Sequence, residues 1–192
     1  MEGTGLDFTA EMRRLCFDVC GRLTEFSHID MGRVAVSTSQ TRRRASHGLY
    51  ASLTPLRFEG GGREQTRRGR VYRVEPVLDA GGREYLYILT FYLPRFCDTS
   101  LEEKLVTVLH ELWHIGPAFD GDLRRFEGRF YAHGPSQKAY DEQMRRFTQA
   151  WLALSPPEHL YEFLTQPFDG LVAEHGRVVG ARVRTPRLVP VG

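Results

Sequence analysis

A chain of 192 residues with a formal net charge of +2 is long enough to bury a core without disulfide bonds or a structural metal ion. It contains no apolar run of about 18 residues, and its first residues lack the basic and then apolar order of a signal peptide. We therefore expect no membrane partner and a cytoplasmic location. The three cysteines, Cys16, Cys20 and Cys97, are an odd number, which argues against a disulfide framework and favours reduced, buried thiols.

The first predicted element is an amphipathic helix over residues 9–26, with Thr9 as its candidate N-cap. Apolar side chains recur there at intervals of three and four residues, which is the spacing of one helix face. The residues of this face are Met12, Leu15, Cys16, Val19, Leu23 and Phe26. We expect this face to cover one side of a β-sheet.

Four strand-like segments rich in β-branched and aromatic residues follow the helix. Glycine runs at 60–62 and 81–82 separate some of them and indicate turns or hairpins. The segments are 33–40, 48–58, 70–79 and 83–94.

A second helix is predicted to begin after Ser100, which stands at capping-box spacing from Glu103. It should end at Gly116-Pro117, and its apolar stripe consists of Leu101, Leu105, Val108, Leu112 and Ile115. A third helix is predicted over 136–154. A proline break then precedes a short helix near 159–165 and a tail in which valines alternate with arginines.

The second helix carries the motif His-Glu-Leu-Trp-His, in which His110 and His114 are four residues apart. Residues at this spacing project from one helix face about one turn apart, so two imidazoles can bind one metal ion. Imidazole ligands with one open position favour Zn²⁺. Glu111 is placed to take a proton from metal-activated water and to pass it to a leaving amine. The motif therefore predicts a zinc hydrolase with Glu111 as its catalytic base.

A catalytic zinc ion needs a third protein ligand, and the downstream sequence offers several. We favour His133, which is followed by glycine and opens the segment of the third helix. Asp120 is an alternative, although the pattern that uses an aspartate there has glycine where this chain has Pro117. Glu127 and Glu142 are further carboxylate candidates.

The segment HELWHIGPAFDGDLRRFEGRFYAHG, residues 110–134, resembles the signature of a small zincin family, the metallopeptidases of phages and bacteria. Its HExxH motif followed by a separate His-Gly is also similar to SprT-like minimal zinc proteases, although no SprT-type cysteine zinc ribbon follows, which argues against a role in DNA repair. The similarity is most specific over 101–147. It implies that His110, His114 and His133 are the zinc ligands and that Glu111 is the base.

The resemblance also implies an α+β fold, a zincin-like domain over 1–155 with an N-terminal helix, a mixed twisted sheet, the HExxH helix beneath it and a following helix. Residues 156–192 would be a C-terminal extension packed on this domain or trailing from it. In such folds the strand nearest the active helix offers its open edge to an extended substrate, and we expect 83–94 to be that strand. The implied reaction is hydrolysis of peptide bonds in a peptide or protein substrate.

Several roles remain open at this stage. Asp120 and Asp122 either form an Asp-Gly turn or orient a ligating imidazole, and Tyr131 or Tyr140 could donate to an oxyanion. The remaining histidines have no partner at ligand spacing and are expected to be structural or superficial. They are His28, His47, His159 and His175.

Nearly all basic residues are arginines, and they cluster at 41–47 and 62–73. Clustered arginines can bind phosphate groups, but the isoelectric point of about 8.5 is lower than expected of a nucleic-acid-binding domain. A nucleic-acid partner is therefore not favoured, and a nucleic-acid-associated SprT-like protease is the second hypothesis. A non-catalytic zinc-bound interaction protein is the third, and Glu111 argues against it because a structural site needs no base.

Overall fold

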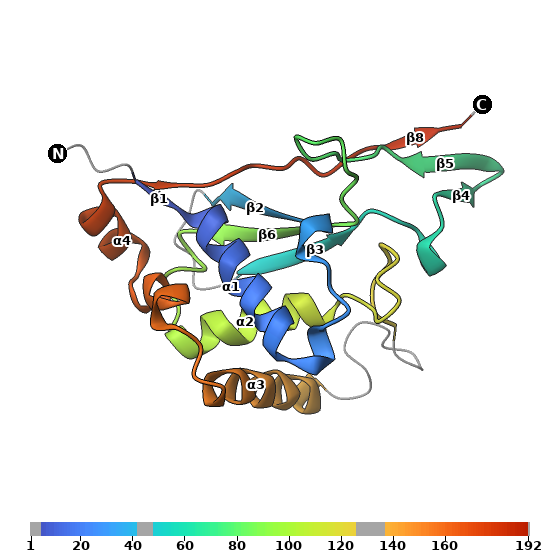
Figure 1. Ribbon diagram of the computed structural model, residues 1–192. Coiled ribbons are helices and arrows are strands. Elements are labelled where there is room, and N and C mark those ends of the chain that lie inside the picture. Colours follow the sequence, from blue (N-terminus) through green and yellow to red (C-terminus); the bar gives the residue numbers. More distant parts are fainter. Residues whose placement is uncertain (1–4, 42–47, 126–136, 192) are drawn as a thin grey trace.

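The chain folds around a three-stranded sheet with the order β2-β6-β3 (Figure 1). The computed structural model describes residues 5–41, 48–125 and 137–191. Strand β2 (Val34–Gln40) runs parallel to β6 (Tyr87–Leu93), and β3 (Ala51–Pro55) runs antiparallel to it. The expectation that 83–94 supplies the open edge is wrong, because β6 is paired on both sides. Its nearly continuous apolar run is typical of a strand buried within a sheet.

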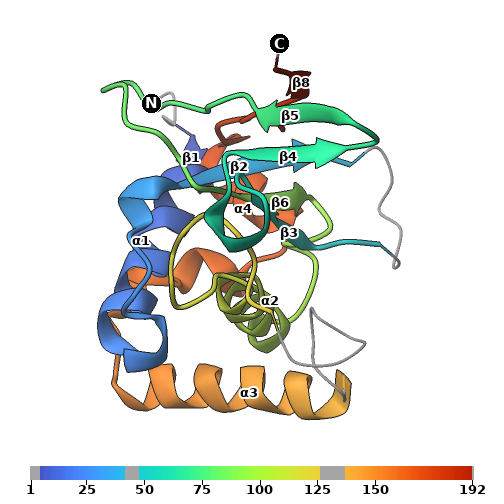
Figure 2. The same cartoon turned by 90° about the vertical axis from the view of Figure 1, so that its right-hand side faces the viewer.

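Helices cover one face of this sheet. Figures 1 and 2 show α1 (Phe8–Arg22) and α2 (Leu101–Trp113) beneath the strands, with α3 (Gln137–Ala153) packed below α2. The sequence therefore predicted the α+β class and this helical layer. The N-cap of α1 is Asp7, whose carboxylate accepts from the Ala10 N–H, and not Thr9, whose hydroxyl accepts a hydrogen bond from the distant Ala181 N–H.

The core between sheet and helices consists of side chains from every one of these elements. From α1 come Met12, Leu15 and Cys16, all fully buried, and from the sheet come Val34, Leu89 and Phe91. The three cysteines are free and buried, as expected. Helix α2 begins with the predicted capping box, since Ser100 and Glu103 each bond the other's backbone N–H.

The opposite face of the sheet has a second, smaller apolar cluster of Ala35, Leu56 and Ile88. Further along the same face the strands carry hydroxyl side chains. A second sheet, with the order β4-β5-β8, lies beyond this cluster and consists of β4 (Glu64–Arg67), β5 (Arg70–Val74) and β8 (Leu188–Pro190). Only the β5 segment among these strands was predicted individually.

The C-terminal segment after α3 packs against the rest of the chain. Short 3-10 turns, η4 (Glu158–Leu160) and η5 (Glu162–Thr165), lead to helix α4 (Phe168–His175), and β7 (Val178–Val179) pairs in parallel with β1 (Leu6–Asp7). Phe163, Leu164 and Leu171 belong to the main core. Within the residues placed by the structure, no helix combines the length and apolar character that a membrane span needs.

Candidate metal centre

The two histidines of the HExxH motif lie side by side at the end of α2. The ring centroids of His110 and His114 are 4.8 Å apart, and both side chains are half-buried. Two imidazoles bound to one tetrahedral zinc ion, with Zn–N bonds of about 2.0–2.1 Å, have centroids about 5 Å apart. The observed separation therefore fits a shared zinc ion.

Glu111 lies on the buried side of the same turn, with only 8% of its surface exposed. Burial raises the pKa of Glu111 to about 7, while a hydrogen bond from the backbone N–H of Leu53 acts in the opposite direction. A carboxyl group with a pKa near neutrality can both accept and return a proton at physiological pH. Leu53 belongs to β3, so this contact joins the motif to the sheet.

The backbone of β3 at Leu53 faces away from the neighbouring strand. The N–H of Tyr92 donates to Tyr50 and that of Leu56 donates to Leu86, so the hydrogen-bonded pairs of the β3–β6 ladder fall on even-numbered residues of β3. The N–H and C=O groups of Ala51 and Leu53 consequently point toward the edge of the sheet. Strand β3, and not β6, is therefore the edge strand beside Glu111.

Tyr140 of α3 completes the described part of this site. Its ring centroid lies 4.9 Å from that of His110 and 6.0 Å from that of His114, nearly parallel to the latter ring. Burial, and to a smaller extent the nearby Glu111 carboxylate, raises the pKa of Tyr140. The phenol therefore keeps its proton and is a potential hydrogen-bond donor. Of the two tyrosines considered above, Tyr131 lies outside the described residues.

Arg124 holds the C-terminal end of α2. Its guanidinium donates to the carbonyl oxygens of Trp113 (2.8 Å) and Ile115 (3.3 Å). Its backbone N–H donates to the carbonyl oxygen of His114 (2.6 Å). The guanidinium also lies 3.8 Å from the centre of the Trp113 ring. These bonds satisfy carbonyl groups that a helix end leaves without partners, and they fix the turn that carries His114. No motif or spacing in the sequence marks Arg124 for this role.

His28 reaches the same helix end, with Nε2 3.3 Å from the carbonyl oxygen of Ile115. Burial lowers its pKa, so the neutral ring is favoured. This agrees with the structural role expected for His28.

The loop after α2 is fixed by Tyr87 and Asp122. The Tyr87 hydroxyl accepts from the Gly121 N–H (3.0 Å) and donates to the Asp122 carbonyl (2.9 Å). Burial alone would raise the pKa of Asp122, but bonds from Arg125, Gly60 and Leu123 outweigh it and lower that pKa. Asp120 accepts from the Asp122 N–H, and Gly121 adopts a φ of +93°. This pattern matches the Asp-Gly turn rather than a carboxylate bonded to an imidazole.

No third protein ligand stands with the two histidines in the part of the chain that the structure describes, since no group of three or more His, Cys, Asp or Glu side chains is arranged there to hold a metal. Asp120 and Glu142 are described residues, and Glu142 lies on exposed α3 surface near Arg146 (3.6 Å). The favoured ligand His133 and the candidate Glu127 lie outside the described residues.

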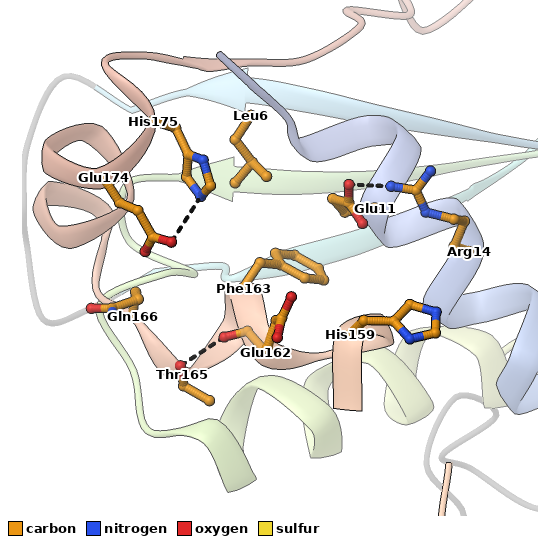
Figure 3. A pocket seen from close by; sticks show the side chains of 10 residues that line it. All are labelled: Leu6, Glu11, Arg14, His159, Glu162, Phe163, Thr165, Gln166, Glu174 and His175. Carbon is orange, nitrogen blue, oxygen red and sulfur yellow. Dashed lines mark hydrogen bonds and ion pairs between the residues drawn. The ribbon is translucent and has the colours of Figure 1, made fainter. Parts of the chain in front are cut away.

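A separate hollow of about 630 Å³ brings together two of the other histidines (Figure 3). His159 and His175 line it with Glu11, Glu162 and Glu174, although sequence spacing had left these histidines without partners. Glu11 is paired with Arg14, and His175 lies 3.9 Å from Glu174. Among the described residues, the side chains around this hollow form no group of three or more His, Cys, Asp or Glu arranged to hold a metal.

Comparisons of the chain with protein-family models, with curated proteins and with solved structures find no match. The assignment of a function therefore depends on the geometry of the α2 site itself.

Proposed function

We propose that the protein is a zinc-dependent metallopeptidase with a zincin-like site. The observation that carries this proposal is the arrangement of His110 and His114, with ring centroids 4.8 Å apart, beside the buried carboxyl group of Glu111. An ordinary amphipathic helix has no reason to bury a glutamate next to two adjacent imidazoles, because burial of an unpaired carboxylate is unfavourable. A hydrolytic site needs that carboxyl group as a base.

His110 and His114 would hold the zinc ion, and His133 is the third ligand that we propose. Zinc held in such a site would polarise a carbonyl oxygen and acidify water. Glu111 would accept a proton from the attacking water at its carboxylate and return it to the leaving amine. The Leu53 N–H keeps one carboxylate oxygen oriented, and Tyr140 is placed to donate a hydrogen bond beside the imidazoles.

The substrate would bind along β3. The outward-facing N–H and C=O groups of Ala51 and the C=O group of Leu53 can pair with an extended peptide as an added strand, while the Leu53 N–H stays bonded to Glu111. Because Leu53 also contacts Glu111, a peptide aligned on this edge would pass the base and the histidine pair. This replaces β6 by β3 as the substrate-binding strand.

Metal analysis of the purified full chain tests the zinc proposal. We expect about one zinc ion per chain, lost in His110→Ala and in His114→Ala, together with cleavage of an unfolded protein substrate that a chelator abolishes. Absence of bound zinc in a folded wild-type protein supplied with the metal would contradict the proposal.

The third ligand needs its own comparison. His133→Ala should lose zinc, whereas Asp120→Ala and Glu142→Ala should retain it. Loss of zinc in Asp120→Ala with retention in His133→Ala would transfer the role to Asp120.

A further inference from the structure

The hairpin between β4 and β5 ends in three closely spaced arginines. Arg67 closes β4, Arg70 opens β5, and the two-residue turn between them is Arg68-Gly69. Figure 1 shows this hairpin projecting at the end of the molecule beyond β3. All three arginine side chains are exposed.

Two features of this tip are unfavourable for folding. Arg68 and Gly69 both have positive φ, +49° and +76°, a turn for which asparagine or aspartate before the glycine is preferred over arginine. Arg67 and Arg70 are directly paired in the register, and like charges opposite each other destabilise a hairpin. An anion bound between Arg67 and Arg70 would offset the repulsion between their charges.

The same arginines enclose a hollow of about 580 Å³, which they line together with Tyr72 and Leu188. Arg67, Arg70 and Tyr72 share one face of the hairpin, because directly paired residues and residues two apart point the same way. The Arg67 guanidinium lies 5.6 Å from the centre of the Phe58 ring and donates to the Gln65 side chain (2.7 Å). None of the described residues that line the hollow is acidic, and no ion pair joins the three arginines to a described carboxylate.

We propose that this arginine hairpin, Arg67 to Tyr72, is a binding site for the phosphate backbone of a nucleic acid. Guanidinium groups bind phosphate oxygens through two parallel hydrogen bonds, and several of them at one tip suit a ligand with regularly spaced anions. The half-buried Tyr72 ring offers a surface on which an unpaired base can stack beside these charges. An acidic peptide would use the charges but not this aromatic surface.

The test measures binding of labelled single-stranded and duplex oligonucleotides to the full chain at rising salt. The variant Arg67→Thr with Arg68→Asn and Arg70→Thr should bind more weakly, and its slope of log affinity against log salt should be shallower by about 2 on single strands and by about 3 on duplexes. The same variant should melt at a higher temperature than wild type, because asparagine suits the turn and threonines pair well across strands. Loss of binding with a gain of stability separates a ligand site from a structural element.

The matched control removes the same number of exposed arginines elsewhere, in Arg145→Gln with Arg146→Gln and Arg177→Gln. It should bind the oligonucleotides nearly as tightly as wild type. If the control variant binds oligonucleotides as weakly as the hairpin variant, net charge explains the effect and the proposal is overturned. The proposal is also overturned if polyglutamate competes as effectively as unlabelled oligonucleotide. Undiminished binding in the hairpin variant, or no binding by wild type at low salt, would overturn it as well. The single substitution Arg68→Asn decides the question if the triple variant does not fold.

Discussion

The two faces of the β2-β6-β3 sheet are formed by the same three strands and have different chemistry. Adjacent cross-strand rows point to opposite faces. On the helix-covered face one row consists of Val36, Leu89 and Leu53, and on the other face the next row consists of Ser37, Thr90 and Ser52. The apolar row lies on the face that packs against α2, where Glu111 is withdrawn from water.

The row of hydroxyl side chains contacts the C-terminal segment of the chain and not the helices. Ser37 accepts from the Val183 N–H (2.9 Å), and a hollow of about 220 Å³ extends over this row and is also lined by Arg182 and Arg184. The contrast teaches that the pKa of about 7 of Glu111 comes from its burial on the helix-covered side of the sheet, and not from the carboxyl group itself. If the helix-covered face alone carries the proposed chemistry, changes on the other face should leave hydrolysis unaffected.

Glu111→Gln should have the largest effect, a loss of about 10²- to 10⁴-fold in peptide hydrolysis, because the amide keeps the shape but cannot accept a proton. Zinc content and folding should be retained. Glu142→Gln, on the exposed side of α3, is the matched control and should leave the rate unchanged. A rate in Glu111→Gln equal to that of wild type would remove Glu111 from the mechanism.

Glu111 should also make the stability of the metal-free protein depend on pH. Its folded pKa of about 7 lies above the ordinary value of 4.5, so the stabilisation from the protonated form is complete below pH 4.5 and is lost as the pH rises to 7. The shift corresponds to about 3 kcal/mol. Urea unfolding of wild type and Glu111→Gln across this range should show wild type losing stability relative to the variant. Parallel pH profiles of the two proteins would contradict the assigned pKa.

Arg124→Met should lower the free energy of unfolding by about 2 kcal/mol, since it leaves the Trp113 carbonyl group without its donor and the Ile115 carbonyl group with His28 alone. Because the turn that carries His114 loosens, zinc affinity and activity should fall as well. Arg146→Met, at an exposed position, should change stability by less than about 0.5 kcal/mol. Unchanged zinc affinity in Arg124→Met would show that the helix end positions the metal ligands without this arginine.

Ser37→Ala, on the other face, should have the smallest effect. It removes the acceptor of the Val183 N–H and should cost about 1 kcal/mol in urea unfolding. Zinc content and hydrolysis should be unchanged. A loss of activity comparable to that of Arg124→Met would mean that the two faces are coupled and that the contrast between them is incomplete.

The parts of this fold that depend on local signals could be predicted from the sequence. Helix α2 follows from its capping box and apolar stripe, and the pairing of His110 with His114 follows from helical spacing. The expected cap at Thr9 was wrong because the hydroxyl of Thr9 is used by a residue from the far end of the chain, and Asp7 caps the helix instead.

The misassigned edge strand had a signal that could have been used. A nearly continuous apolar strand is typical of a central position, which argues against β6 as an edge. By contrast, nothing in the local sequence indicates that Leu53 donates to Glu111 or that Arg124 bonds the end of α2, because both contacts depend on how distant segments pack. The immediate surroundings of the motif were therefore beyond sequence reasoning even where the motif itself was clear.

Lys104 joins helix α2, which carries the HExxH motif, to the segment that follows α3. Its side chain is 1% exposed, and its ammonium group donates to the carbonyl oxygens of Leu164 (2.7 Å) and Gln166 (3.0 Å). A chain cut at residue 155 would keep the whole HExxH motif but would leave this buried charge with neither acceptor, which is strongly unfavourable. The α2 site consequently does not fold independently of this segment. A truncated chain must include the residues through Gln166 for helix α2 to stay folded.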